Sequence, residues 1–84
     1  MSTNEELALQ YQAGNEAALL PLWDQVYGLA YTIASSYTET MRSNPAVDLD
    51  DLLQASFLGV EAAARRYDPN RSAFTTYASL YIRR

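Results

Sequence analysis

The chain has 84 residues, a length that allows one domain with a single hydrophobic core. It contains neither cysteine nor histidine, which excludes disulfides, thiolate metal sites, cysteine nucleophiles and histidine-based acid–base catalysis. Apolar residues make up 49% of the chain and charged residues 19%, a composition typical of a globular domain. We therefore expect a small folded protein that is not an enzyme.

The net charge of -4 conceals an uneven distribution of charge along the chain. Residues 1–64 contain nine acidic residues and one arginine, whereas residues 65–84 contain five arginines and one aspartate. This asymmetry favours an anionic partner for the C-terminal quarter, with a chance segregation of surface charges as the alternative. The N-terminus is acidic, unlike a secretory signal, and no apolar run approaches the roughly 18 residues of a membrane span, so we expect a cytoplasmic protein.

The first half of the chain predicts two helices. Thr3 and Glu6 have the spacing of a capping box at the start of a short helix that ends at Gly14, and Asn15 can cap the next helix. Apolar residues of that second helix recur every three or four positions, at Ala18, Leu19, Leu22, Val26, Leu29, Ile33 and Tyr37. Because proline deep inside a helix costs about 3 kcal/mol, we expect a kink or break just before Pro21, or a restart with Pro21 in the first turn.

A loop signal over residues 43–45 precedes the third predicted helix. Asp48 has the position of its N-cap, and Val47 can pack on Leu52 as a hydrophobic staple. One continuous stripe of this helix is apolar or small, at Leu49, Leu52, Leu53, Ser56, Val60, Ala63, Ala64 and Tyr67. The stripe predicts one face toward the core and an opposite face that is free for a partner. Gly59 and the alanines after it predict close approach of another helix.

The aspartates at the start of this helix could suggest a cation site, since hard cations prefer carboxylate oxygens. Their positions have a simpler interpretation. Asp48 is the cap, and Asp50 and Asp51 lie in the first turn, where the helix dipole favours negative charge. We therefore expect no metal site here.

The final segment combines aromatic, hydroxyl and arginine side chains. A turn at 68–71 precedes a helix in which Phe74, Tyr77, Tyr81 and Arg84 follow one another at spacings of three and four. Such a stripe is commonly core, but rings interleaved with hydroxyls and arginines can also form a platform for single-stranded nucleic acid. Both interpretations stay open from the residues alone. The periodicity and the punctuation together predict an all-α fold.

Three ordered blocks of the sequence resemble a known family. They are Asp51–Ala63 with Gln54 and Gly59, then Arg66–Arg71, then Phe74–Ala78 followed by Ile82 and Arg83. The combination resembles region 2 of the sigma-70 family of bacterial RNA polymerase sigma factors. The resemblance implies a compact helical bundle of four to five helices. It implies one domain over 1–84, with leading helices in 1–46, a polymerase-docking helix in 47–67 and a loop and DNA-facing helix in 68–84.

The resemblance also implies two binding functions in transcription initiation. One helix would dock on the clamp helices of the largest subunit of core RNA polymerase, and the next would capture flipped bases of the non-template strand at the promoter minus-ten element. Carried over by position, the polymerase contacts are Asp51, Gln54, Ala55, Leu58 and Glu61. The DNA contacts are Arg71, Phe74, Thr76, Tyr77, Leu80, Tyr81, Arg83 and Arg84. No cofactor, metal or catalytic residue is implied.

The chain departs from the family pattern at identifiable positions. Leu80 and Tyr81 stand where the family has a tryptophan pair. Ala55, Ser56 and Phe57 stand where an acid and small polar residues often follow the glutamine. The chain ends within the last helix of region 2, so we expect either an excised domain or one part of a split factor. A separate region 4 protein and an anti-sigma factor are then further partners. The alternative function is a polymerase-interacting co-factor or decoy that does not melt promoters.

Overall fold

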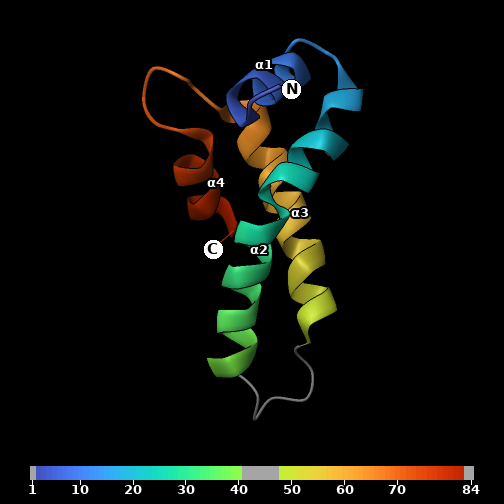
Figure 1. Cartoon of the computed structure of the whole chain (residues 1–84), viewed down its shortest axis with the longest axis vertical. Helices are drawn as coiled ribbons and strands as arrows, with labels where there is room; N and C mark the ends of the chain where they lie inside the picture. Colours follow the sequence, from blue (N-terminus) through green and yellow to red (C-terminus); the bar gives the residue numbers. More distant parts are fainter. Residues whose placement is uncertain (1, 41–47, 83–84) are drawn as a thin grey trace.

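The computed structural model describes residues 2–40 and 48–82, and for 37–40 it describes the backbone alone. The elements are α1 (Asn4–Gln12), the 3-10 helix η1 (Glu16–Ala18), α2 (Leu19–Thr40), α3 (Leu49–Arg66) and α4 (Phe74–Ile82). Every element of these described ranges is helical, which confirms the predicted all-α class. The long helices α2 and α3 run antiparallel, α1 lies across one end of the pair, and α4 packs beside them near that end (Figure 1).

The start of α1 has the predicted capping box. The Glu6 N–H donates to the Thr3 hydroxyl at 3.1 Å, and the Thr3 N–H donates to the Glu6 carboxylate at 2.9 Å. These hydrogen bonds with Thr3 hold the pKa of Glu6 below its usual range. The reversal after α1 uses Gly14 at φ +103°, a conformation that a residue with a Cβ rarely adopts.

The predicted cap at Asn15 is wrong, because its side chain makes no capping hydrogen bond. The chain enters the 3-10 helix η1 at this point, and the Ala18 N–H donates to the backbone carbonyl of Asn15 at 3.1 Å. The donor that a capping side chain would have bound is therefore already satisfied by the backbone.

The expected interruption before Pro21 is found as the change from η1 to α2. Pro21 lies in the first turn of α2, where its missing N–H removes no hydrogen bond from the helix interior. Beyond it, the buried residues of α2 are Leu22, Val26, Ala30, Ile33 and Ala34. The side chain of Tyr37, for which the sequence predicts the next position on this face, lies outside the described part of the chain.

The helix α3 begins at the predicted cap. The Asp51 N–H donates to the Asp48 carboxylate at 2.9 Å, and the Ser56 hydroxyl, although buried, donates to the Leu52 carbonyl at 2.8 Å. Val60, Ala63 and Ala64 complete the buried face. The loop signal at 43–45 and the Val47 half of the staple lie outside the described residues.

Gly59 is the point at which α3 and α4 meet. A Cβ at this position would lie 3.2 Å from the Tyr81 carbonyl oxygen and 3.3 Å from its carbon. The predicted close approach of another helix is therefore confirmed, and the helix is α4. Phe74 at the start of α4 is completely buried with Leu22, Val26 and Val60 in the core.

Among the described residues, no helix combines the length and the apolar character that crossing a membrane requires.

Candidate functional site

The outer face of α3 is open to solvent. Asp51, Gln54, Ala55 and Leu58 are exposed there, and Leu58 retains 65% of its accessible surface. These residues lie about one half-turn away from the buried Val60 stripe, as the 3.6-residue period of a helix requires. The structure thus brings four of the five predicted polymerase contacts together on one surface, with a polar end at Asp51 and an apolar end at Leu58.

Glu61, the fifth predicted polymerase contact, lies at the edge of this face. It is half-buried, and its carboxylate accepts a hydrogen bond from the Tyr11 hydroxyl at 2.7 Å. The same carboxylate pairs with the Arg65 guanidinium at 2.8 Å. The hydrogen bond to Glu61, with burial and the carboxylate charge adding to it, raises the pKa of Tyr11 above its ordinary value. Glu61 therefore links α1 to α3 within the domain.

The predicted DNA contacts on α4 fall into distinct environments. Thr76 and Leu80 are exposed, and Leu80 retains 57% of its accessible surface. Tyr77 and Tyr81 are half-buried, with ring centroids 5.2 Å apart and hydroxyl oxygens 3.0 Å apart. Phe74 is buried completely, so its ring has no accessible face in this structure. Arg83 and Arg84 lie outside the described residues.

The buried Tyr67 packs against two of these rings. Its ring makes a T-shaped contact with Phe74 at 5.3 Å and a tilted contact with Tyr77 at 6.1 Å. Its hydroxyl donates to the Ser72 carbonyl at 2.7 Å, which fixes the loop before α4. Burial, with the charges of Glu5 and Asp68 adding to it, raises the pKa of Tyr67 above its ordinary value.

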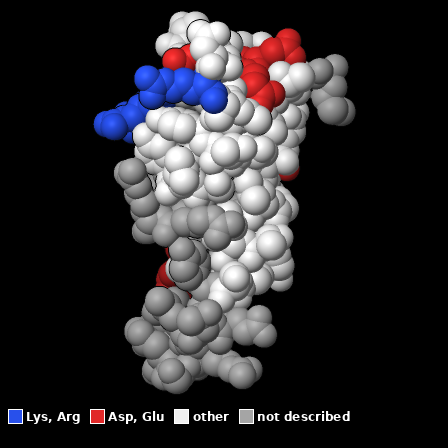
Figure 2. All heavy atoms as spheres, turned by 90° about the vertical axis from the view of Figure 1, so that its left-hand side faces the viewer, with Lys and Arg blue, Asp and Glu red and all other residues white. Residues whose placement is uncertain are grey.

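A small polar cavity opens beside Tyr77. Its volume is about 270 Å³, and Arg66, Asp68, Arg71 and Tyr77 line it. Arg71 and Asp68 approach each other at 3.8 Å, but both are well exposed, so their pairing contributes little stability. Figure 2 shows basic side chains gathered at the upper end of this side of the molecule, next to acidic ones. An aromatic wall next to two guanidinium groups can stack a base and bind its phosphate.

The helix α1 braces this region from the opposite end of the sequence. The Gln12 amide donates to the carbonyls of Ala64 at 2.9 Å and Tyr67 at 2.7 Å, at the C-terminus of α3. The Glu5 carboxylate accepts from the Phe74 N–H at 2.8 Å, at the N-terminus of α4. The helix dipole favours a carboxylate at that end. The ends of both helices that flank the loop are therefore held by side chains of α1.

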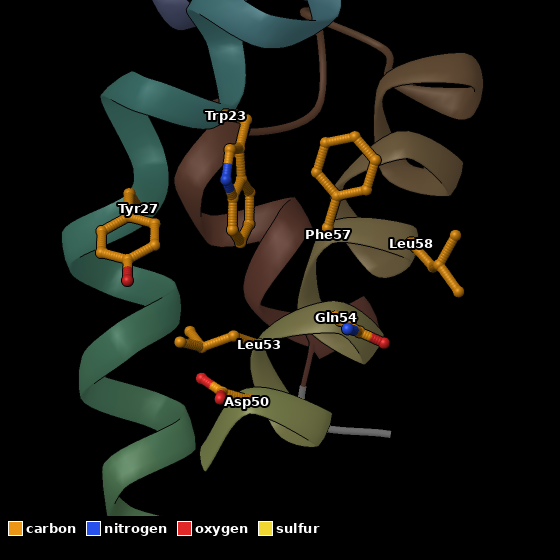
Figure 3. A pocket seen from close by; sticks show the side chains of 7 residues that line it. All are labelled: Trp23, Tyr27, Asp50, Leu53, Gln54, Phe57 and Leu58. Carbon is orange, nitrogen blue, oxygen red and sulfur yellow. The ribbon is translucent and has the colours of Figure 1, made fainter.

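A second cavity, which was not predicted from the sequence, lies between α2 and α3 (Figure 3). Its volume is about 570 Å³, and it is lined by Trp23, Tyr27, Asp50, Leu53, Gln54, Phe57 and Leu58. The Trp23 ring makes T-shaped contacts with Tyr27 at 5.5 Å and with Phe57 at 5.3 Å. The spacing of four residues that joins Trp23, Tyr27 and Tyr31 was the available signal, because such residues share one helix face.

The aspartates at the start of α3 do not assemble a cation site. Asp48 caps the helix, and Asp50 and Asp51 are exposed in its first turn. Within the ranges 2–40 and 48–82, no three acidic side chains lie close enough together to share a metal ion.

Comparison with known proteins gives one family. Residues 22–84, which are 63 of the 84 residues, match the family model described as Sigma-70 region 2. The matched range includes both cavities and all of α3 and α4, whereas α1 precedes it. The comparisons with curated proteins and with solved structures gave no significant match.

Proposed function

Since the chain belongs to the sigma-70 region 2 family, we propose that it binds core RNA polymerase through the outer face of α3 and unpaired promoter bases through α4. The family is a non-enzymatic domain of transcription initiation factors, whose partners are core RNA polymerase and promoter DNA. The proposal concerns which surfaces of this chain make those contacts. It places the non-template strand of the minus-ten element on α4 and the clamp helices of the largest subunit on α3.

One observation carries the proposal for DNA: the half-buried Tyr77 forms a wall of the cavity that also contains Arg66 and Arg71. Extruding a base from a duplex costs a few kcal/mol, and each stack on an aromatic ring returns about 1–3 kcal/mol. The guanidinium groups add contacts to phosphate. Binding to unpaired bases can then offset the cost of melting.

The remaining α4 residues have different parts in this proposal. Thr76 and Leu80 are exposed beside Tyr77 and can contact neighbouring nucleotides directly. The Tyr81 hydroxyl forms a hydrogen bond with the Tyr77 hydroxyl, which keeps the Tyr77 ring in place. Phe74 is buried, so it supports the platform from the core, and a base cannot reach its ring without unpacking the domain.

The proposal for polymerase rests on the exposed group formed by Asp51, Gln54, Ala55 and Leu58. It joins a carboxylate and an amide to an apolar end, and no described helix of the chain covers these four side chains. Protein interfaces combine apolar and polar side chains in a similar way. Glu61 lies at the border of this surface, where its carboxylate forms an ion pair with the Arg65 guanidinium.

The experiment is capture of core polymerase by the immobilised chain, compared with the variant Asp51→Arg/Gln54→Ala. We expect the double variant to lose capture and to keep wild-type helicity by circular dichroism, because both side chains are exposed. Thr75→Arg/Thr76→Ala, on the exposed side of α4, is the control and should still bind polymerase. Wild-type capture by the α3 variant would contradict the proposed surface.

A co-factor or decoy that binds polymerase without melting promoters is the second candidate. The exposed Leu80 favours it, because a leucine offers no flat aromatic surface for a base. Leu80→Trp separates the two functions. If the chain opens promoters, the added ring should strengthen opening in the presence of core polymerase. If the chain only docks, polymerase binding remains and no variant at this position opens DNA.

A further inference from the structure

We propose that Gln12 of α1 is a positioning residue for the capture of unpaired bases, because its amide group fixes the end of α3 from which the DNA-facing loop starts. The helix α1 precedes the residues that match the family model, and none of the predicted contacts lies on it. This inference rests on the proposed function, because it names a residue that orders the cavity beside Tyr77. Its test is designed so that it can fail while base capture by Tyr77 stands.

The C-terminus of α3 is capped by a side chain from a distant part of the sequence. The last carbonyl groups of a helix have no partner within it, and many helices satisfy them with a left-handed glycine turn. Tyr67 instead follows α3 directly in an extended conformation, at φ -64° and ψ 136°. The Gln12 amide nitrogen donates to the Ala64 carbonyl at 2.9 Å and to the Tyr67 carbonyl at 2.7 Å. One side chain therefore holds together the last turn of α3 and the first residue after it.

Tyr67 connects this cap to the cavity. Its ring centroid lies 5.3 Å from that of Phe74 and 6.1 Å from that of Tyr77. Its hydroxyl donates to the Ser72 carbonyl at 2.7 Å, within the loop. Tyr77 is the aromatic wall of the cavity of about 270 Å³. The position of the Tyr67 backbone, which Gln12 holds, therefore affects both the wall and the loop.

The charged lining of the cavity begins at the same point of the chain. Arg66 is the last residue of α3, and Asp68 and Arg71 follow in the loop. Because Arg66 and Asp68 flank Tyr67, the Gln12 hydrogen bond acts on the residue between two lining side chains. A change in the direction in which the chain leaves α3 would move these charged groups relative to the Tyr77 ring.

The other end of the loop is also attached to α1. The Glu5 carboxylate accepts from the Phe74 N–H at 2.8 Å, where α4 begins. Both ends of the loop are thus held by the same short helix before any DNA binds. A site that is ordered in the free protein loses less conformational entropy when its ligand binds. Loss of the Gln12 cap should therefore lower the affinity for bases even while the domain stays folded.

The proposed polymerase surface is separate from this cap. Asp51, Gln54, Ala55 and Leu58 lie in the N-terminal part of α3, whereas Gln12 bonds at its C-terminus. A variant of Gln12 should therefore reduce base capture and leave the capture of core polymerase unchanged.

Gln12 and Gln10 form a matched pair for the test. Both are exposed glutamines of α1, but the hydrogen bonds to the end of α3 belong to Gln12. Gln12→Met keeps the length of the side chain and removes the donor. In complex with core polymerase, Gln12→Met should weaken binding of a single-stranded minus-ten oligonucleotide about tenfold, roughly the loss of one aromatic stack, and Gln10→Met should change it less than about twofold. Fluorescence anisotropy of the labelled oligonucleotide measures both affinities.

Rescue by a different donor separates positioning from side-chain packing. Gln12→Lys retains a donor, and a positive charge is favoured at a helix C-terminus, so it should bind the oligonucleotide within about threefold of the wild type. Gln12→Glu has nearly the same shape without a donor and should bind as weakly as Gln12→Met, with Gln10→Glu as the control for the added charge. If Gln12→Lys binds as weakly as Gln12→Met, the donor has no part in base capture and the inference is wrong. If Gln12→Met does not fold, the comparison of Gln12→Lys with Gln12→Glu decides.

Circular dichroism and urea unfolding establish that each variant is folded under the conditions of the assay. Wild-type affinity of Gln12→Met for the oligonucleotide would overturn the inference. An equal loss of polymerase capture would also overturn it, since the cap would then act on the whole domain.

Tyr77→Ala identifies which of the two proposals has failed. If Tyr77→Ala binds the oligonucleotide as the wild type does, the proposed function is contradicted. If Tyr77→Ala loses binding and Gln12→Met does not, base capture on α4 stands and only the part assigned to Gln12 is wrong.

Discussion

The domain contains two aromatic clusters of similar composition with different surroundings. The α4 cluster consists of Tyr67, Phe74, Tyr77 and Tyr81, and the α2–α3 cluster consists of Trp23, Tyr27 and Phe57. In the α4 cluster, the Tyr67 hydroxyl is tied to the loop and the rings stand on a buried Phe74. In the α2–α3 cluster, the rings border an open cavity of about 570 Å³. Residue type alone therefore does not decide whether an aromatic side chain belongs to the core or lines an accessible cavity.

The position of α1 accounts for much of this difference. Glu5 and Gln12 hold the two helix ends that flank the loop before α4, and this end of the bundle is covered. Neither contact involves the α2–α3 cluster, which lines the cavity between the two long helices (Figure 3). The braced cluster therefore has a fixed geometry, as the proposed contact with unpaired bases requires, whereas the α2–α3 cluster borders an accessible cavity.

The two phenylalanines of the chain provide the largest test of this comparison. Phe74 is completely buried and Phe57 is half-buried. We expect Phe74→Ala to reduce the free energy of unfolding by about 3–5 kcal/mol, and Phe57→Ala by about half of that or less. Urea unfolding followed by circular dichroism measures both values. Equal losses would show that the two clusters are equally part of the core.

The brace from α1 to α4 predicts a smaller effect at Glu5. Glu5→Ala removes the acceptor of the Phe74 N–H and should cost about 1 kcal/mol, as expected for a lost helix cap. Glu5→Gln keeps a side-chain oxygen and should retain most of that stability. Hydrogen exchange of the α4 amides is the measurement, because faster exchange confined to the start of α4 locates the effect. If the amides at the start of α4 exchange no faster in Glu5→Ala than in the wild type, or if exchange rises equally over the whole chain, the brace from α1 to α4 is contradicted.

Gly28 and Gly59 provide a matched pair for which we expect smaller changes in the free energy of unfolding. A Cβ at Gly28 meets nothing within 4 Å, whereas one at Gly59 lies 3.2 Å from the Tyr81 carbonyl oxygen. Gly28→Ala should stabilise the protein by about 0.5–1 kcal/mol, because alanine is the better helix former. Gly59→Ala should lose this gain or destabilise the protein, because α4 has to move. Thermal unfolding of both variants checks the expectation, and an equal gain at both positions would show that α3 and α4 do not touch there.

The raised pKa of Tyr67 predicts a pH dependence with a defined sign. Because its pKa is higher in the folded protein than the ordinary value near 10, the unfolded chain loses this proton first as pH rises. The stabilising contribution is thus complete below pH 10 and falls as the pH rises above it. Tyr67→Phe should make the free energy of unfolding less sensitive to alkali, and the raised pKa of Tyr11 should leave a remainder. An unchanged alkaline slope in Tyr67→Phe would contradict this origin.

The sequence predicted the parts of the fold that depend on local signals. The capping box at Thr3, the cap at Asp48 and the approach of a helix at Gly59 each follow from one or two residues, and each is confirmed. The cap at Asn15 failed because a backbone carbonyl, which any residue carries, bound the donor first. Local chemistry can name a competent side chain, but it does not show which competitor is nearer.

The contacts between distant segments could not be predicted from periodicity. Glu5 and Phe74 are 69 positions apart, and Gln12 and Tyr67 are 55 apart, so no spacing rule joins them. The α2–α3 cluster was missed for a related reason. The apolar period of α2 follows its buried face through Leu22 and Val26. The aromatic row on the neighbouring face lines a cavity only because α3 lies beside it in the fold.

The measurement that tests the division between the two clusters most directly is promoter opening by core polymerase, followed with a fluorescent base analogue in the minus-ten element. At saturating polymerase, the wild-type chain and Tyr27→Ala, a variant of the α2–α3 cluster, should give the same rise in fluorescence. Tyr77→Ala should bind polymerase normally, keep its helicity and give no rise. Full opening by Tyr77→Ala, or its unfolding, would contradict the assignment of the α4 cluster to DNA.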